Sequence, residues 1–194
     1  MEGKEPRPVR IEWRPGITLT EYAAKWVDMA PHIDALREYA SQAERIVEFG
    51  VRGGVSTWAM LKGLPPGGAI LAVDNDPDVA EMMPPWVRDD PRLSLVIGDD
   101  LTVTLPVQRA DIVAIDSGHE YEQTLAELDR AVSLDPLRII LHDYLYAETP
   151  GVRQAVDEWT ARTTWQLETV HPSQWGLAVL THRLPDWTMK VPSL

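Results

Sequence analysis

Residues 46–57, IVEFGVRGGVST, decide the fold. An apolar run leads directly into a turn that holds Gly50, Gly53 and Gly54, and an acid, Glu48, lies within the apolar run. A glycine turn directly after a buried strand lets the backbone approach a ligand closely. A tight turn that serves only packing is the alternative.

Short apolar runs alternate with amphipathic segments along most of the chain. Such alternation predicts a doubly wound α/β fold, a mostly parallel sheet of about seven strands with helices on both faces. Only HPSQ separates the last two strands, which is too short for a parallel crossover, so we expect an antiparallel final strand. The predicted strands are 45–49, 69–74, 92–98, 111–116, 137–143, 165–170 and 175–183. The predicted helices are 18–30, 31–42, 55–64, 78–83, 120–134 and 151–162.

The length of 194 residues favours a single domain. Three prolines and alternating charges make 1–16 an N-terminal arm, followed by one domain over 17–194. Within it, 17–44 form N-terminal helices and 45–194 the ligand-binding core. Thr18 and Glu21 form a predicted capping box at the first helix.

The composition excludes several classes of function. A net charge of −12 opposes nucleic acid and anionic membranes as partners. The absence of cysteine excludes disulfides, zinc–thiolate sites and thiol nucleophiles. No signal core or membrane-spanning stretch occurs, so a cytoplasmic protein is expected by default. The oligomeric state, including a homodimer, is left open.

The spacing of the glycines does not match the common nucleotide-binding motifs. It lacks both the G-x-G-x-x-G pattern and the Gly-Lys-Ser/Thr ending of a P-loop. The remaining pattern, E-x-G-x-x-x-G, resembles the first motif of class I S-adenosylmethionine-dependent methyltransferases, in which this turn cradles the amino-acid half of the cofactor. The resemblance implies cofactor binding by Glu48, Gly50, Gly54 and Ser56, and further along the chain by Asn75 and Asp116.

Acids also follow the next two predicted strands. Asp74 ends the second strand, where a carboxylate can accept both ribose hydroxyls, and Asn75 follows it. Asp99 and Asp100 end the third, where the family places an acid facing the adenine amino group. The alternatives are a helix cap near Asp74 and a turn with solvated charges at 99–100.

The downstream half resembles small-molecule O-methyltransferases of the macrocin and catechol types. In their metal-dependent members an acid ends the fourth strand and an Asp-Asp or Asp-Asn pair ends the fifth. The matching positions are Asp116 and the pair His142–Asp143, so histidine departs from the pattern. These three residues are candidate ligands for Mg²⁺, Mn²⁺ or Fe²⁺, and imidazole favours the latter two. Alternatively, the two aspartates orient a substrate or the histidines.

His119 lies three residues after Asp116, at the offset of the lysine base of catechol-type enzymes. Its reference pKa of about 6.5 suits proton transfer near neutrality. The catalytic candidates are therefore His119, Asp116 and His142. The alternatives are a solvated histidine at a helix start and a buried structural histidine at 142.

Together these features predict transfer of the S-adenosylmethionine methyl group to a hydroxyl of a small-molecule acceptor. Two other functions stay open. One is a non-catalytic cofactor-binding or assembly protein with the same fold. The other takes the acidic run at 74–76 as the metal motif of a nucleotide-sugar glycosyltransferase, which the glycine turn disfavours.

Overall fold

The computed structural model describes residue 14 and residues 16–183, so most of the predicted N-terminal arm (1–16) lies outside the described residues. Within them one seven-stranded sheet forms, with strand order β3-β2-β1-β4-β5-β7-β6. The strands are β1 (Arg45–Phe49), β2 (Ala69–Asp74), β3 (Leu93–Ile97), β4 (Ile112–Ile115), β5 (Arg138–Leu141), β6 (Trp165–His171) and β7 (Leu177–His182).

The strand directions confirm the predicted fold class. Strands β1 to β5 pair in parallel, while β7 runs antiparallel to both β5 and β6. The short link between the last two strands enforces this reversal, because a parallel connection needs a crossover of a dozen residues or more.

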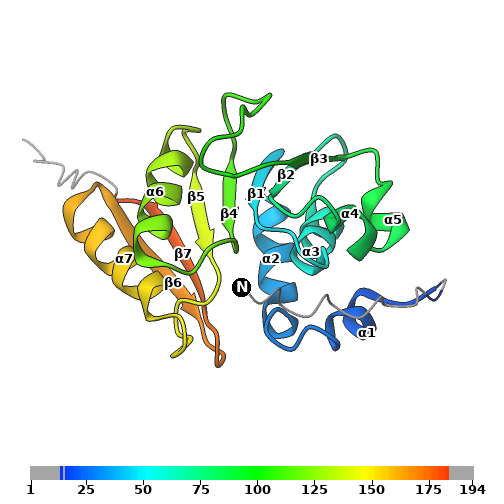
Figure 1. Cartoon of the computed structure of the whole chain (residues 1–194), viewed down its shortest axis with the longest axis horizontal. Helices are drawn as coiled ribbons and strands as arrows, with labels where there is room; N and C mark the ends of the chain where they lie inside the picture. The colour runs from blue at the N-terminus through cyan, green and yellow to red at the C-terminus, as the bar shows by residue number, and fades with distance from the viewer. Residues whose placement is uncertain (1–13, 15, 184–194) are drawn as a thin grey trace, which may run out of the picture.

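Helices cover both faces of the sheet (Figure 1). Alternate strand residues point to opposite faces and divide the core in two. One face packs on the helices before β1 and on those that follow β1 and β2, and the other on α6 and α7. The helices are α1 (Leu19–Ala23), η1 (Ala30–His32), α2 (Ile33–Ala40), α3 (Val55–Gly63), α4 (Val79–Met82), α5 (Pro85–Arg88), α6 (Tyr121–Val132) and α7 (Pro150–Arg162).

The first helix is shorter than the sequence predicts. The capping box forms as expected, with Thr18 accepting from the Glu21 backbone and Glu21 accepting from the Thr18 backbone. However, α1 stops at Ala23, and 24–29 run as turns. Trp26 explains the early end, because its indole packs directly against Gly53, where an added Cβ would lie 2.2 Å from the ring. A tertiary contact thus overrides local helix propensity.

The carboxyl ends of the five parallel strands meet at one edge of the sheet. The strand order reverses between β1 and β4, since β1 leads outward to β2 and β4 leads outward to β5. Ligands of doubly wound sheets bind at such a switch point. Within the described part of the chain, no helix has the length and apolar character needed to cross a membrane.

Candidate functional site

The glycine turn after β1 is shaped by the neighbouring strand end. Gly50 has a φ of +84°, which favours glycine. A Cβ there would lie 2.1 Å from the carbonyl oxygen of Asp116. Gly54, with a φ of +71°, precedes α3 and contacts Met83. Gly50 is therefore required by the approach of β4, so the packing alternative named for this turn is sufficient to explain glycine at this position.

We expect Gly50→Ala to destabilise the protein far more than Gly67→Ala. Both glycines have left-handed φ values, +84° and +88°, but nothing lies within 4 Å of a Cβ at Gly67. The left-handed conformation costs about 1–2 kcal/mol in either variant. The clash at Gly50 adds about 1–3 kcal/mol. Urea unfolding of both variants measures the difference, and equal losses would show that Asp116 does not constrain the turn.

Glu48 lies beneath the turn and not at its surface. Its side chain is 1% exposed. Its carboxylate accepts hydrogen bonds from Ser56 Oγ at 2.5 Å and Thr57 Oγ1 at 2.6 Å, which ties β1 to the first turn of α3. Burial raises the pKa of Glu48 to about 7. Glu48 and Ser56 thus bond to each other, and their contact with a cofactor stays a prediction.

Asp74 at the end of β2 holds the glycine turn in place. Its Oδ2 accepts from the backbone N–H groups of Val51 at 2.8 Å and Arg52 at 3.0 Å, and its Oδ1 accepts from Asp76 N at 2.9 Å. A carboxylate offers about four acceptor positions, so capacity for ligand hydroxyls remains. Asn75 lies beside it, and both residues line the cleft described below.

The structure separates the two acids that follow β3. Asp99 is exposed and accepts from the backbone N–H of Leu101, which closes the turn. Asp100 is 7% exposed and lines the cleft. Of this pair, only Asp100 is placed to face a ligand there.

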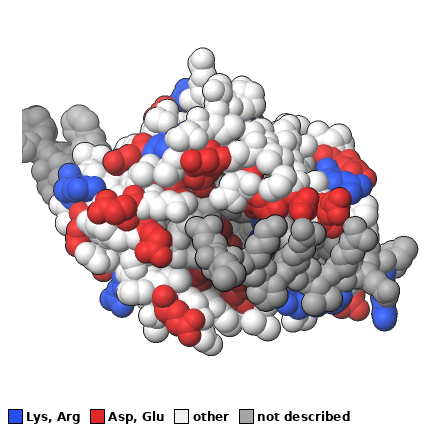
Figure 2. Space-filling view, viewed as in Figure 1, with Lys and Arg blue, Asp and Glu red and all other residues white. Residues whose placement is uncertain are grey.

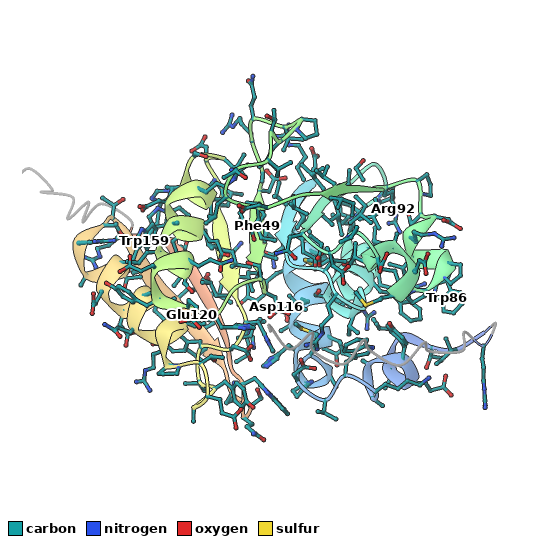
Figure 3. The ribbon with its side chains drawn as sticks, viewed as in Figure 1. Phe49, Trp86, Arg92, Asp116, Glu120 and Trp159 are labelled. Atoms are coloured by element: carbon teal, nitrogen blue, oxygen red, sulfur yellow. The ribbon has the colours of Figure 1, made fainter. Side chains whose placement is uncertain are left out.

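The four residues proposed for catalysis or metal binding come together at the ends of β4 and β5, near the middle of the molecule where Figure 3 labels Asp116. His142 Nδ1 lies 3.2 Å from Asp116 Oδ1 and 3.1 Å from Asp143 Oδ1. His119 Nε2 lies 2.8 Å from Asp143 Oδ2 and 3.8 Å from Asp116 Oδ1. Two imidazoles and two carboxylates thus form one cluster.

The backbone at Asp143 explains how two consecutive side chains reach the same site. Successive residues of a strand point to opposite faces. Asp143 follows β5 with a φ of +61°, in the left-handed region that aspartate tolerates better than most residues. This turn brings its carboxylate to the side of His142.

The contacts within the cluster shift the pKa values of its residues. Contacts with Asp116 and Asp143 raise the pKa of His119 to about 9. Burial alone would lower the pKa of His142, but the same two carboxylates raise it to about 10. The histidines in turn hold the pKa of Asp143 far below its ordinary value. Without a bound cation, both imidazoles are therefore protonated at neutral pH.

Asp28, which the sequence analysis did not single out, also contacts His142. The Nε2 of His142 donates to the backbone carbonyl of Asp28 at 3.2 Å. The Asp28 side chain pairs with Arg52 at 2.5 Å, and Arg52 stacks on Trp26. No motif marks this segment, because only the turns after α1 carry it back to the sheet edge.

A cleft of about 460 Å³ joins these strand ends. Its lining is mostly acidic, and the basic residues in the lining are one arginine, Arg52, and one histidine, His119. Figure 2 shows Asp and Glu side chains at several places on the side of the molecule in view, with fewer Lys and Arg side chains. The lining carboxylates are Asp28, Asp74, Asp76, Asp100, Asp116 and Asp143. The lining also includes Gly50, whereas Gly54 and Ser56 lie outside it.

Residues 47–144, about half of the chain, match the model of a family described as methyltransferase domain. The chain belongs to this family. The match spans the glycine turn of this methyltransferase domain and every strand-end acid discussed above. It confirms the resemblance to class I S-adenosylmethionine-dependent methyltransferases.

Solved structures share the fold of this methyltransferase domain. Cofactor-bound Rv0187 from MTB is 20% identical with a TM-score of 0.70, over 87% of this chain and 92% of that one. An O-methyltransferase from Bacillus cereus in complex with SAH is 16% identical with a TM-score of 0.64, over 87% and 92%. TomG from Streptomyces achromogenes, an O-methyltransferase solved with SAM, is 17% identical with a TM-score of 0.65, over 84% and 87%. No protein of curated function matches the sequence significantly.

Proposed function

We propose that this methyltransferase domain transfers the methyl group of S-adenosylmethionine to a hydroxyl of a small molecule. One observation carries the proposal: the glycine turn after β1 and the acids after β2, β3, β4 and β5 line a single cleft at the switch point of the sheet. Structural neighbours solved with SAM or SAH support the cofactor, and two of them are O-methyltransferases.

The cleft suits the charge and shape of S-adenosylmethionine. The cofactor carries a positive sulfonium, which an acidic lining attracts. In the proposed pose the ribose hydroxyls bind Asp74, the adenine lies toward Asp100, and the amino-acid half lies over the turn at Gly50. The methyl group then points toward the cluster of Asp116 and His119.

The chemistry is an in-line displacement at the methyl carbon. The acceptor oxygen forms a bond to this carbon while the carbon–sulfur bond breaks, and the products are a methyl ether and S-adenosylhomocysteine. The acceptor proton passes to His119, which must be neutral to accept it. The fold contributes mainly by holding the two reactants in line.

The residues of the cluster fit a divalent metal. Asp116, His142 and Asp143 each offer one ligand atom, all within 4.8 Å of one another. His142 donates its Nε2–H to a backbone carbonyl, as metal-bound histidines usually do, which leaves Nδ1 for a metal. Asp143 Oδ1 is buried and lies 3.1 Å from His142 Nδ1, and no described residue gives it a well-directed hydrogen bond. A bound cation would polarise the acceptor hydroxyl as a Lewis acid.

Calorimetric titration tests the proposed cofactor. We expect S-adenosylmethionine and S-adenosylhomocysteine to bind the wild-type protein. Asp74→Asn should weaken binding by about 2 kcal/mol, roughly thirtyfold in Kd, because a charge-assisted contact is lost. Asp78→Asn makes the same charge change on an exposed residue of the same loop and should leave Kd unchanged. Equal affinities in both variants would contradict the role of Asp74.

A screen for methyl transfer from labelled S-adenosylmethionine to hydroxylated metabolites then identifies the acceptor. Transfer to an oxygen supports the proposal. Cofactor binding without turnover across the screen would favour the non-catalytic alternative, and binding of a nucleotide sugar alone would favour the glycosyltransferase.

A further inference from the structure

Helix α6 carries a row of polar residues beside the cleft, and the proposed chemistry does not use these residues. Gln123, Glu127 and Arg130 follow one another at spacings of four and three, so they share one face of the helix. Glu127 has no exposed surface. A buried acid is costly unless its oxygens find partners, and the partners of Glu127 point to its role.

Glu127 gathers residues that line the cleft. Its Oε1 accepts from Ser117 Oγ at 2.6 Å and from Gln123 Nε2 at 2.8 Å. Ser117, Gln123 and Asp100 all line the cleft, on loops after two different strands and on α6 itself. One buried carboxyl group therefore joins the loop after β4 to the cleft-lining face of α6.

The second oxygen of Glu127 faces another acid. Oε2 is buried, and none of the described residues gives it a hydrogen-bond donor. Asp100 is its acidic neighbour. Burial raises the pKa of Asp100, while its contacts with Ser117, Arg130 and Glu127 act in the opposite direction and favour the carboxylate. Two adjacent buried carboxylates cannot both ionise without a large cost, so one proton should lie between them.

The surroundings place that proton on Glu127. Burial, with the charge of Asp100 nearby, raises the pKa of Glu127 to about 7. The positive charge of Arg130 favours the ionised form of Asp100. Arg130 also donates to the backbone carbonyls of Leu101 and Val103, which fixes the loop that carries Asp100. In this state Glu127 accepts through Oε1 and donates through Oε2.

We propose that Glu127, as a neutral acid, is a positioning residue that holds Asp100 and Ser117 so that the cleft selects a 6-aminopurine over a 6-oxopurine. The inference rests on the proposed function, because the purine is that of the cofactor. An ionised, fixed Asp100 accepts from the exocyclic amino group of adenine. The same carboxylate would face the carbonyl oxygen of a 6-oxopurine, which offers no proton.

Calorimetry with two ligands tests the inference: S-adenosylhomocysteine and its 6-oxo analogue, S-inosylhomocysteine. We expect the wild-type protein to prefer the amino form by about thirtyfold or more. Glu127→Gln should keep that preference within about threefold, because the amide supplies both an acceptor and a donor. Glu127→Met fills a similar volume without polar atoms and should reduce the preference about tenfold or more. Glu122→Gln, on the exposed face of α6, is the control and should change nothing.

The outcomes separate the two proposals. If the wild-type protein binds neither ligand, the proposed function is wrong and the inference falls with it. If it binds and Glu127→Met keeps the preference, only the inference is wrong. Loss of the preference in Glu127→Gln would show that an ionised Glu127 is needed, which also overturns the inference. Should Glu127→Met fail to fold in thermal unfolding, Ser117→Ala, which removes one hydrogen-bond partner of Glu127, takes its place. It should also reduce the preference, and an unchanged preference would overturn the inference.

Discussion

His119→Ala should lower turnover by about two to four decades, the usual contribution of a general base. Affinity for S-adenosylhomocysteine should change little, because the predicted cofactor contacts lie with other residues. His119 lines the cleft and contacts both carboxylates of the cluster, so its imidazole is placed where the acceptor hydroxyl must lose its proton. Turnover and cofactor affinity are measured in the same variant.

The control for this variant is Glu120→Ala, which changes the adjacent exposed residue, labelled in Figure 3. It should leave turnover unchanged. If His119→Ala retains turnover within about threefold of wild type on a verified substrate, the base lies elsewhere, and His142 becomes the next candidate.

The pH dependence of turnover follows from the same contacts. A base must be unprotonated, so activity should rise with pH. In the metal-free protein the two carboxylates raise the pKa of His119 to about 9, which an NMR titration of its imidazole should show. A cation bound to those carboxylates should lower that pKa, so the turnover midpoint in the presence of Mn²⁺ should lie below 9. A midpoint above 9 with the metal present would contradict this account of the cluster.

Removing divalent metal should lower turnover about tenfold or more, since a Lewis acid at the acceptor oxygen contributes several kcal/mol. Because His142 belongs to the ligand set, Mn²⁺ or Fe²⁺ should restore activity at least as well as Mg²⁺. His142→Ala should reduce the metal content found by elemental analysis, whereas His182→Ala, at the exposed end of β7, should not. Full activity after exhaustive chelation, with no metal detected, would contradict the metal site and show that the side chains of the cluster act without a metal.

The strand-end residues could be predicted because the parallel sheet aligns them. Apolar runs such as those of β4 and β5 identify buried strands, and their carboxyl ends necessarily share one edge. Asp74, Asp116 and Asp143 each end or follow one of these strands, and all three line the cleft. Which aspartate of the pair 99–100 faces inward depends on the turn geometry, which the sequence pattern does not encode.

The remaining parts of the site depend on tertiary contacts. Asp28 reaches His142 only because α1 ends early and Trp26 packs on Gly53. Glu127 is an ordinary helix residue by propensity and becomes buried because α6 packs against the loops after β3 and β4. Its spacing from Gln123 and Arg130 was the available signal, but an i, i+4, i+7 polar row usually indicates an exposed face.

A crystal structure with S-adenosylhomocysteine tests the central claim most directly. We predict that the ligand lies in the cleft, with its ribose on Asp74, its adenine beside Asp100 and its sulfur directed toward Asp116 and His119. A ligand bound elsewhere, or a cleft that stays empty at saturating ligand concentration, would contradict the proposed function.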